Sequence, residues 1–350
     1  MGYFRENVES MNGYEPGAQP ESGDVVKLNT NENPYPPSPA VMDAIKNIDA
    51  GRLRRYPEVG GDSFRNAAAK LWGLKKENFI CTNGGDDLLT IAIRAFCDSS
   101  RPLAYPGPTY SLYPVLAKIQ NCQTIELPFD NEFNLPSKLA STEAGMIIVC
   151  NPNAPSGTVV PVSELAMLAG ETKGVLLIDE AYADFAENNC VEMVKDFDNV
   201  IILRSMSKGY SLAGVRFGYG IASEKLIAGM MKVKDSYNAD VVAITAAAAA
   251  IGDEQYFKTN VEKVKAERVR LAGELEGIGF FVYPSQANFV LAKNNSAKIR
   301  AIDIYEKLKE QNIFVRYWAY PELQDKLRIT VGTAEQNDKL ICALKQIVSS

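Results

Sequence analysis

The stretch Asn199-Val200-Ile201-Ile202-Leu203-Arg204-Ser205-Met206-Ser207-Lys208, followed eight residues later by Arg216, decides how the rest of the chain is interpreted. Its apolar half is typical of a buried parallel strand. Lys208 therefore comes just after the carboxyl end of a strand, where open α/β sheets bind ligands. An amine, two hydroxyls and a guanidinium suit a cofactor that carries an aldehyde and a phosphate. Lys208 can form a Schiff base with the aldehyde, while Ser205, Ser207 and Arg216 hold the phosphate.

The composition narrows the classes of function. A chain of 350 residues is long enough for two domains, and a net charge of -6 argues against nucleic acid or an anionic membrane as partner. The six cysteines are scattered without a Cys-x-x-Cys pair, as expected for reduced thiols in a cytoplasmic protein. The chain has no histidine, which excludes histidine-based triads and imidazole acid–base chemistry. Proton transfer is then left to lysine, carboxylate or tyrosine.

Short apolar runs alternate with helical patterns along most of the chain. This alternation predicts an α/β fold, in which a mostly parallel sheet is flanked by helices on both faces. We expect an N-terminal arm over residues 1–28 and a large domain over 29–238. An Ala-rich helix, a long charged helix and two strand candidates then predict a smaller α+β domain over 239–350. The predicted strands of the large domain are Phe79–Cys81, Pro102–Tyr105, Met146–Cys150, Val175–Ile178, Val200–Leu203 and Phe217–Ala222.

A glycine turn and an aromatic turn follow the first two predicted strands. The turn Asn83-Gly84-Gly85-Asp86-Asp87 opens a helix, where backbone N–H groups and the helix dipole favour an anion. A Gly-Gly pair at a helix start can also be only a turn. Tyr110 ends the next loop. Its ring can lie on a planar cofactor or pack in the core.

Two further loops carry groups that suit a pyridine ring. Asp179 follows an apolar run and can pair with a protonated ring nitrogen, which makes the ring an electron sink. A carboxylate in this place is also a common helix cap. Tyr182 can hydrogen-bond the phenolic oxygen of the ring, and an asparagine amide in the turn 151–157 can donate to the same oxygen. These loops all follow successive strands of one predicted sheet.

In this order, the motifs resemble those of pyridoxal-phosphate aminotransferases of the aspartate-aminotransferase fold type, also called PLP transferase fold type I. More narrowly, the chain resembles the histidinol-phosphate aminotransferases over nearly its whole length. The narrower likeness rests on residues 14–20, 28–34, 55–57, 207–216, 315–317 and 327–333.

The resemblance implies a role for each candidate residue. Pyridoxal 5'-phosphate would be the cofactor, bonded to Lys208, which also moves protons. Asp179 would pair with the ring nitrogen, Tyr182 with the ring oxygen, and Tyr110 would stack on the ring. The residues implied around the phosphate are Gly84, Gly85, Asp86, Ser205, Ser207 and Arg216.

The resemblance also implies how substrate and a second subunit take part. Arg328, assisted by Arg316, would bind the anionic group of the substrate, and Asn31 and Tyr35 belong to an N-terminal segment that closes over it. Tyr56 would reach the cofactor phosphate of a neighbouring subunit, which implies a homodimer with shared active sites.

One departure from the family pattern concerns the ring oxygen. Ala154 stands where the family usually has asparagine before the Pro-Ser-Gly turn, and Asn153 is expected to take over the hydrogen bond. In the lysine loop, Gly209 and Tyr210 replace a common Ala-Phe pair.

The implied reaction belongs to histidine biosynthesis. Histidinol phosphate would give its amino group to the cofactor, and a keto acid such as 2-oxoglutarate would then take it. Three alternatives stay open on the same fold: a broad aromatic or general amino-acid aminotransferase, a threonine-phosphate decarboxylase, and a non-catalytic relative.

Overall fold

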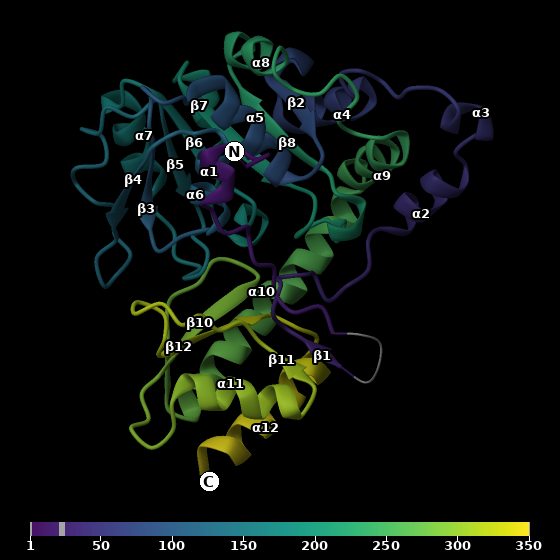
Figure 1. Cartoon of the computed structure of the whole chain (residues 1–350). Helices are drawn as coiled ribbons and strands as arrows, with labels where there is room; N and C mark the ends of the chain where they lie inside the picture. Colours follow the sequence, from purple (N-terminus) through teal and green to yellow (C-terminus); the bar gives the residue numbers. More distant parts are fainter. Residues whose placement is uncertain (1, 21–24, 350) are drawn as a thin grey trace.

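The computed structural model of the chain describes residues 2–20 and 25–349. Its centre is a seven-stranded sheet in the order β2-β8-β7-β6-β5-β3-β4 (Figure 1). Strand β8 runs antiparallel to β2 and β7, and the other pairs are parallel, which confirms the predicted α/β class. The strands are β2 Phe79–Thr82, β3 Leu103–Gly107, β4 Thr124–Pro128, β5 Met146–Cys150, β6 Val175–Asp179, β7 Val200–Ser205 and β8 Gly218–Ala222.

Alternate residues of the central strands enter two separate apolar layers, as the strand period of two requires. Ile147 and Val149 of β5 join one layer, whereas Ile148 and Cys150 join the other. The first layer includes α2 Pro39–Lys46, α4 Asp62–Trp72, α7 Val162–Glu171 and α9 Val241–Gly252. The second includes α5 Gly85–Phe96, α6 Leu112–Ile119 and α8 Glu224–Met230. Two short helices lie outside these layers, α1 Glu6–Glu9 and α3 Ala50–Leu53.

A smaller unit packs beside the carboxyl edge of this sheet, with the long helix α10 passing from one unit to the other (Figure 1). It contains an antiparallel sheet in the order β12-β10-β9 and a parallel pair, β1 with β11. Its helices are α10 Glu254–Gly277, α11 Ala301–Glu310 and α12 Ala334–Ser349. Its strands are β1 Val26–Lys27, β9 Phe280–Val282, β10 Phe289–Asn294, β11 Ile313–Phe314 and β12 Lys326–Thr330.

Two segments pack with another unit than the one in which we expected them. Ala243 and Ile251 of α9 are buried in the large unit, so the Ala-rich helix packs there. Val26 and Leu28 are buried in the small unit, although we expected them in the arm. We therefore place the main boundary at Asp253, whose carboxylate accepts a hydrogen bond from the N–H of Tyr256 and caps α10.

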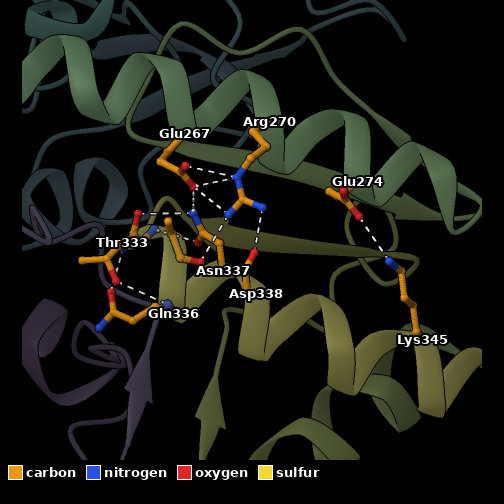
Figure 2. A network of polar contacts seen from close by, with 10 residues as sticks. Glu267, Arg270, Glu274, Thr333, Gln336, Asn337, Asp338 and Lys345 are labelled. Carbon is orange, nitrogen blue, oxygen red and sulfur yellow. Dashed lines mark hydrogen bonds and ion pairs between the residues drawn. The ribbon is translucent and has the colours of Figure 1, made fainter.

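A polar network fixes the turn after β12 (Figure 2). Asn337 is fully buried, and its side-chain oxygen accepts a hydrogen bond from the N–H of Gly332 at 3.0 Å. Its amide donates to Glu267 of α10, which also receives Arg270. The end of β12, the strand that carries Arg328, is thereby held against α10.

Among residues 2–20 and 25–349, every helix is too short or too polar to span a bilayer.

A buried ion cluster joins strand β7 to the segment after β6, and it gives a first prediction. Arg204 donates to Glu180 at 2.9 Å and to Asp184, and all three side chains are at most 7% exposed. Arg204→Met leaves two buried carboxylates without their cation. We expect the free energy of unfolding to fall by about 3–5 kcal/mol, measured by guanidinium denaturation.

The control for this prediction is an exposed ion pair. Lys75 pairs with Glu224, and its side chain is 74% exposed. Because water screens such a pair, Lys75→Met should leave the free energy of unfolding nearly unchanged. If Arg204→Met lowers the free energy of unfolding no more than this control does, the buried cluster does not stabilise the fold as we infer.

Candidate active site

A cavity of about 940 Å³ opens at the carboxyl edge of the large sheet and is lined by residues of both units. Strand ends β6 and β7 contribute Asp179 and Ser205, and strand β12 contributes Arg328. The predicted residues that line it are Asn31, Gly85, Asp86, Tyr110, Asp179, Tyr182, Ser205, Ser207, Lys208, Arg216, Arg316 and Arg328. The sequence-predicted loops therefore converge on one site, as their place after parallel strands requires.

One end of the cavity is built for a phosphate. Helix α5 begins at Gly85, so its first N–H groups face this end. The Arg216 guanidinium lies 3.4 Å from Ser207 Oγ and 3.5 Å from Asp86. Gly84 does not line the cavity but has φ +80°, and a Cβ there would lie 2.6 Å from the Arg216 guanidinium. A glycine at this position is thus required for the arginine to lie over the turn.

Lys208 is held at the centre of the cavity. Its Nζ donates to the carbonyl oxygen of Thr30 at 3.2 Å and lies 5.7 Å from the centre of the Tyr182 ring. Asn33 donates to the Lys208 carbonyl at 3.0 Å and fixes the backbone of the loop. Burial, helped by the positive charge of Arg328, lowers the pKa of Lys208 to about 8. A substantial fraction of this amine is therefore neutral near physiological pH, as a nucleophile needs.

The pKa of Lys208 predicts how the chain without cofactor should take up the pyridoxal phosphate that the resemblance implies. Only the neutral amine attacks an aldehyde, so the association rate should rise as pH passes through about 8 and level off above it. The growth of visible absorption after mixing, followed from pH 6 to pH 10, measures this rate. A rate that is still rising steeply at pH 10 would mean that Lys208 titrates like an exposed lysine.

Asp179 and Tyr182 are each fixed by a partner. The Tyr113 hydroxyl donates to Asp179 Oδ2 at 2.7 Å, and the Ala181 N–H donates to Oδ1 at 3.1 Å. Burial raises the pKa of Asp179 to about 6, so the group is still mostly a carboxylate at neutral pH. Asn31 donates to the Tyr182 hydroxyl at 2.9 Å, and burial raises the pKa of Tyr182, which keeps its proton available to donate.

The two arginines lie at the side of the cavity formed by the small unit. Arg328 donates to the carbonyl of Asn29 at 2.8 Å, and Arg316 donates to the carbonyls of Glu15 and Pro16. Within the described part of the chain, neither forms an ion pair with a carboxylate. Both cations are therefore left to bind an anion that enters the cavity.

Besides Gly84, three predicted site residues do not line the cavity. The structure contradicts the predicted hydrogen bond from Asn153 to the ring oxygen. The Asn153 amide donates to the Pro108 carbonyl and to Ser156 Oγ, while its oxygen accepts from Thr109. It has no donor left for a ring oxygen, and Ala154 faces the cavity instead.

Tyr35 and Tyr56 also lie outside the cavity. Tyr35 lines a separate groove beside the start of α10, where Lys263 Nζ is 5.0 Å from its ring, so it is not placed to contact substrate here. Tyr56 is 80% exposed and stacks on Tyr237 at the surface. It therefore does not reach the cavity of its own chain.

The structure adds residues that we did not predict for the site. Tyr14 of the arm lines the cavity and meets the Tyr110 ring edge-on, with ring centres 5.8 Å apart. Tyr113, in the first turn of α6, donates to Asp179, and its ring meets the Tyr110 ring edge-on with ring centres 5.6 Å apart. Glu32 and Trp318 also line the cavity.

Comparison with known proteins agrees with this geometry. Residues 23–344 match the family described as aminotransferase class I and II. The chain belongs to this family. It is 48% identical over 348 residues, 99% of both chains, to histidinol-phosphate aminotransferase 1 of Trichormus variabilis. It is 39% identical to histidinol-phosphate aminotransferase of Rhodopirellula baltica, over 99% of this chain and 96% of that one.

A solved structure shows the same fold. Histidinol-phosphate aminotransferase from Sinorhizobium meliloti, in complex with pyridoxal-5'-phosphate, superposes with a TM-score of 0.90 at 24% identity. The match covers 100% of this chain and 98% of that one. The present chain thus belongs to the aminotransferases and has the PLP transferase fold type I.

The residues present fit this cofactor. The glycine turn, Ser207 and Arg216 together suit a phosphate. The turn approaches Arg216 so closely that a Cβ on residue 84 would collide with the guanidinium. Lys208 provides an amine of lowered pKa for an aldehyde. Asp179 provides a buried carboxylate for a ring nitrogen.

Proposed function

We propose that this aminotransferase moves the amino group of histidinol phosphate to 2-oxoglutarate, in histidine biosynthesis. The observation that carries the proposal is the pair Arg316 and Arg328, two cavity-lining cations whose hydrogen-bond partners here are backbone carbonyls. A phosphate dianion has enough oxygens for two guanidinium groups, and a carboxylate can bind one of them bidentately. The site therefore suits a phosphorylated amine in one half-reaction and a keto acid in the other. Relatives at 48% and 39% identity carry the matching name.

Each residue of the site then has a task. Bound pyridoxal phosphate supplies an electron sink that makes the hydrogen on the substrate's amine-bearing carbon acidic. Asp179, held by Tyr113, provides the negative charge for a protonated ring nitrogen. Lys208 takes up the proton that leaves the substrate carbon and delivers it again, since its lowered pKa suits both directions near neutral pH. Tyr182, oriented by Asn31, would donate to the ring oxygen, for which Asn153 has no free donor.

We also propose a cytoplasmic homodimer with shared active sites. Tyr56 supports the dimer, because it is exposed on its own chain and follows the exposed residues Leu53, Arg54 and Arg55. All six cysteines are free thiols, which supports a reducing compartment. Tyr56→Phe should then weaken cofactor binding in the dimer, and light scattering should give twice the mass of one chain.

The test of the substrate follows the visible absorption of the cofactor. Purified enzyme is mixed with histidinol phosphate without any keto acid, and the band of bound pyridoxal phosphate should be lost in one turnover. Adding 2-oxoglutarate should restore it, with glutamate formed in equal amount.

Other amines separate the rival functions. An enzyme that responds equally well to phenylalanine or tyrosine would be a broad aromatic aminotransferase. Release of CO₂ from threonine phosphate would favour the decarboxylase, whose solved relative at 20% identity shares the fold alone with this chain. An absorption band that histidinol phosphate leaves unchanged would reject the proposed substrate.

A further inference from the structure

Trp318 lies among the charges that the proposed function assigns to substrate binding. The guanidinium carbons of Arg316 and Arg328 are 5.3 Å and 5.2 Å from the centre of its ring. Arg328 is also 5.2 Å from the ring of Phe289. One indole is therefore within cation–π distance of both arginines.

The two arginines are also joined through their backbones. Arg316 and Arg328 exchange two N–H···O=C hydrogen bonds of 2.9 Å across an antiparallel bridge. Directly opposed residues have their side chains close together, and like charges in such a pair repel. Burial and then the charge of Arg316 disfavour the protonated form of Arg328 and lower its pKa. Without a compensating group, the two guanidinium groups would move apart.

The remaining contacts leave room for an anion. The arm carbonyls of Glu15 and Pro16 receive Arg316, and Asn29 receives one nitrogen of Arg328. The Nε of Arg328 is buried and has no hydrogen-bond partner in the described part of the chain. A buried donor without a partner costs free energy, and the guanidinium that carries it belongs to a residue that lines the cavity.

We propose that Trp318 is a positioning residue that holds Arg316 and Arg328 together as a two-guanidinium site for the substrate phosphate, and so favours a phosphorylated amine over a carboxylate. This inference rests on the proposed function. The negative face of the indole offsets part of the repulsion between the two cations. A phosphate engages both guanidinium groups, whereas a carboxylate needs only one bidentate fork. Loss of the indole should therefore weaken phosphate binding more than carboxylate binding.

The chain offers a matched control beside Trp318. Successive residues of an extended segment point to opposite sides, and Tyr317 stacks on Tyr305 against the core of the small unit instead of lining the cavity. Tyr317→Phe removes one hydroxyl one residue away from Trp318. It should leave both phosphate and carboxylate binding unchanged.

The experiment compares Trp318→Leu, Trp318→Phe and Tyr317→Phe in the cofactor-loaded enzyme. Calorimetric titration with inorganic phosphate gives its Kd, and steady-state kinetics with histidinol phosphate and with glutamate give kcat and KM. In Trp318→Leu we expect the phosphate Kd and the KM for histidinol phosphate to rise about tenfold or more, with kcat and the KM for glutamate changed by less than about threefold. Trp318→Phe, which keeps an aromatic face, should show a smaller rise.

Either of two results would overturn the proposal. The first is a phosphate Kd unchanged in Trp318→Leu, and the second is an equal loss for histidinol phosphate and glutamate. If Trp318→Leu does not fold, the comparison of Trp318→Phe with Tyr317→Phe decides by the same criterion. If the unmodified enzyme binds phosphate but does not turn over histidinol phosphate, the proposed function fails, and the phosphate titration still tests Trp318.

Discussion

Lys208→Ala should abolish transamination, with a loss in kcat of at least about 10⁴-fold. The amine is the group of lowered pKa at the centre of the cavity, and it has two tasks, to bond the cofactor and to carry a proton. Proton transfer by a positioned side chain alone contributes about 10²–10⁴-fold. The measurement is single-turnover loss of histidinol phosphate in the presence of excess pyridoxal phosphate. The visible band typical of lysine-bound cofactor should also be absent.

A matched lysine controls for the loss of a positive charge. Lys173 has an 85% exposed side chain and precedes β6, so it lies at the amino edge of the sheet, away from the cavity. Lys173→Ala should retain full activity. Residual turnover of Lys208→Ala above about one part in a hundred would remove Lys208 from the chemistry.

Asp179→Asn should leave the cofactor bound and reduce kcat by about 10²–10³-fold, the usual effect of removing one preorganised electrostatic group. The substitution keeps the size of the side chain and an oxygen for the Ala181 N–H, but it removes the negative charge that Tyr113 orients. Without this charge a protonated ring nitrogen has no partner. Cofactor content per chain and kcat, measured on the same preparation, separate a chemical defect from lost binding.

A matched surface aspartate controls for the change from aspartate to asparagine. Asp196 is an exposed aspartate, and Asp196→Asn makes the same chemical change at the surface. We expect no effect on kcat. Full activity of Asp179→Asn would contradict the role of its carboxylate.

The buried strands of the large unit could be predicted because they are continuous apolar runs. β5 and β6 are buried at every position, which a sequence pattern shows directly. The edge strand β4 was missed because its residues alternate between half-buried and exposed, and it ends at Pro128. Most of the cavity-lining residues at the carboxyl edge of the large sheet could be predicted for the same reason, because the loops that carry them directly follow buried strands.

The residues that could not be predicted depend on how the loops turn. Asn153 and Ala154 are neighbours, and the turn aims the amide at Pro108 and Ser156 while the methyl group faces the cavity. Tyr14 and Trp318 enter the site because distant segments fold back over it. No local pattern encodes such a meeting.

The pairing of β1 with β11 has a consequence for synthesis of the chain. Val26 is opposite Ile313, and the N–H of Asn31 donates to Thr330. The same segment carries Thr30, whose carbonyl accepts a hydrogen bond from Lys208. Its position is therefore fixed by residues that are synthesised nearly three hundred positions later. Domains generally fold as units while the chain leaves the ribosome. The large sheet can form first, with Lys208 in place, but the site formed by Arg316 and Arg328 cannot. A nascent chain stalled before Arg328 would carry the nucleophile without the anion site, so substrate recognition is the last property that the growing polypeptide acquires.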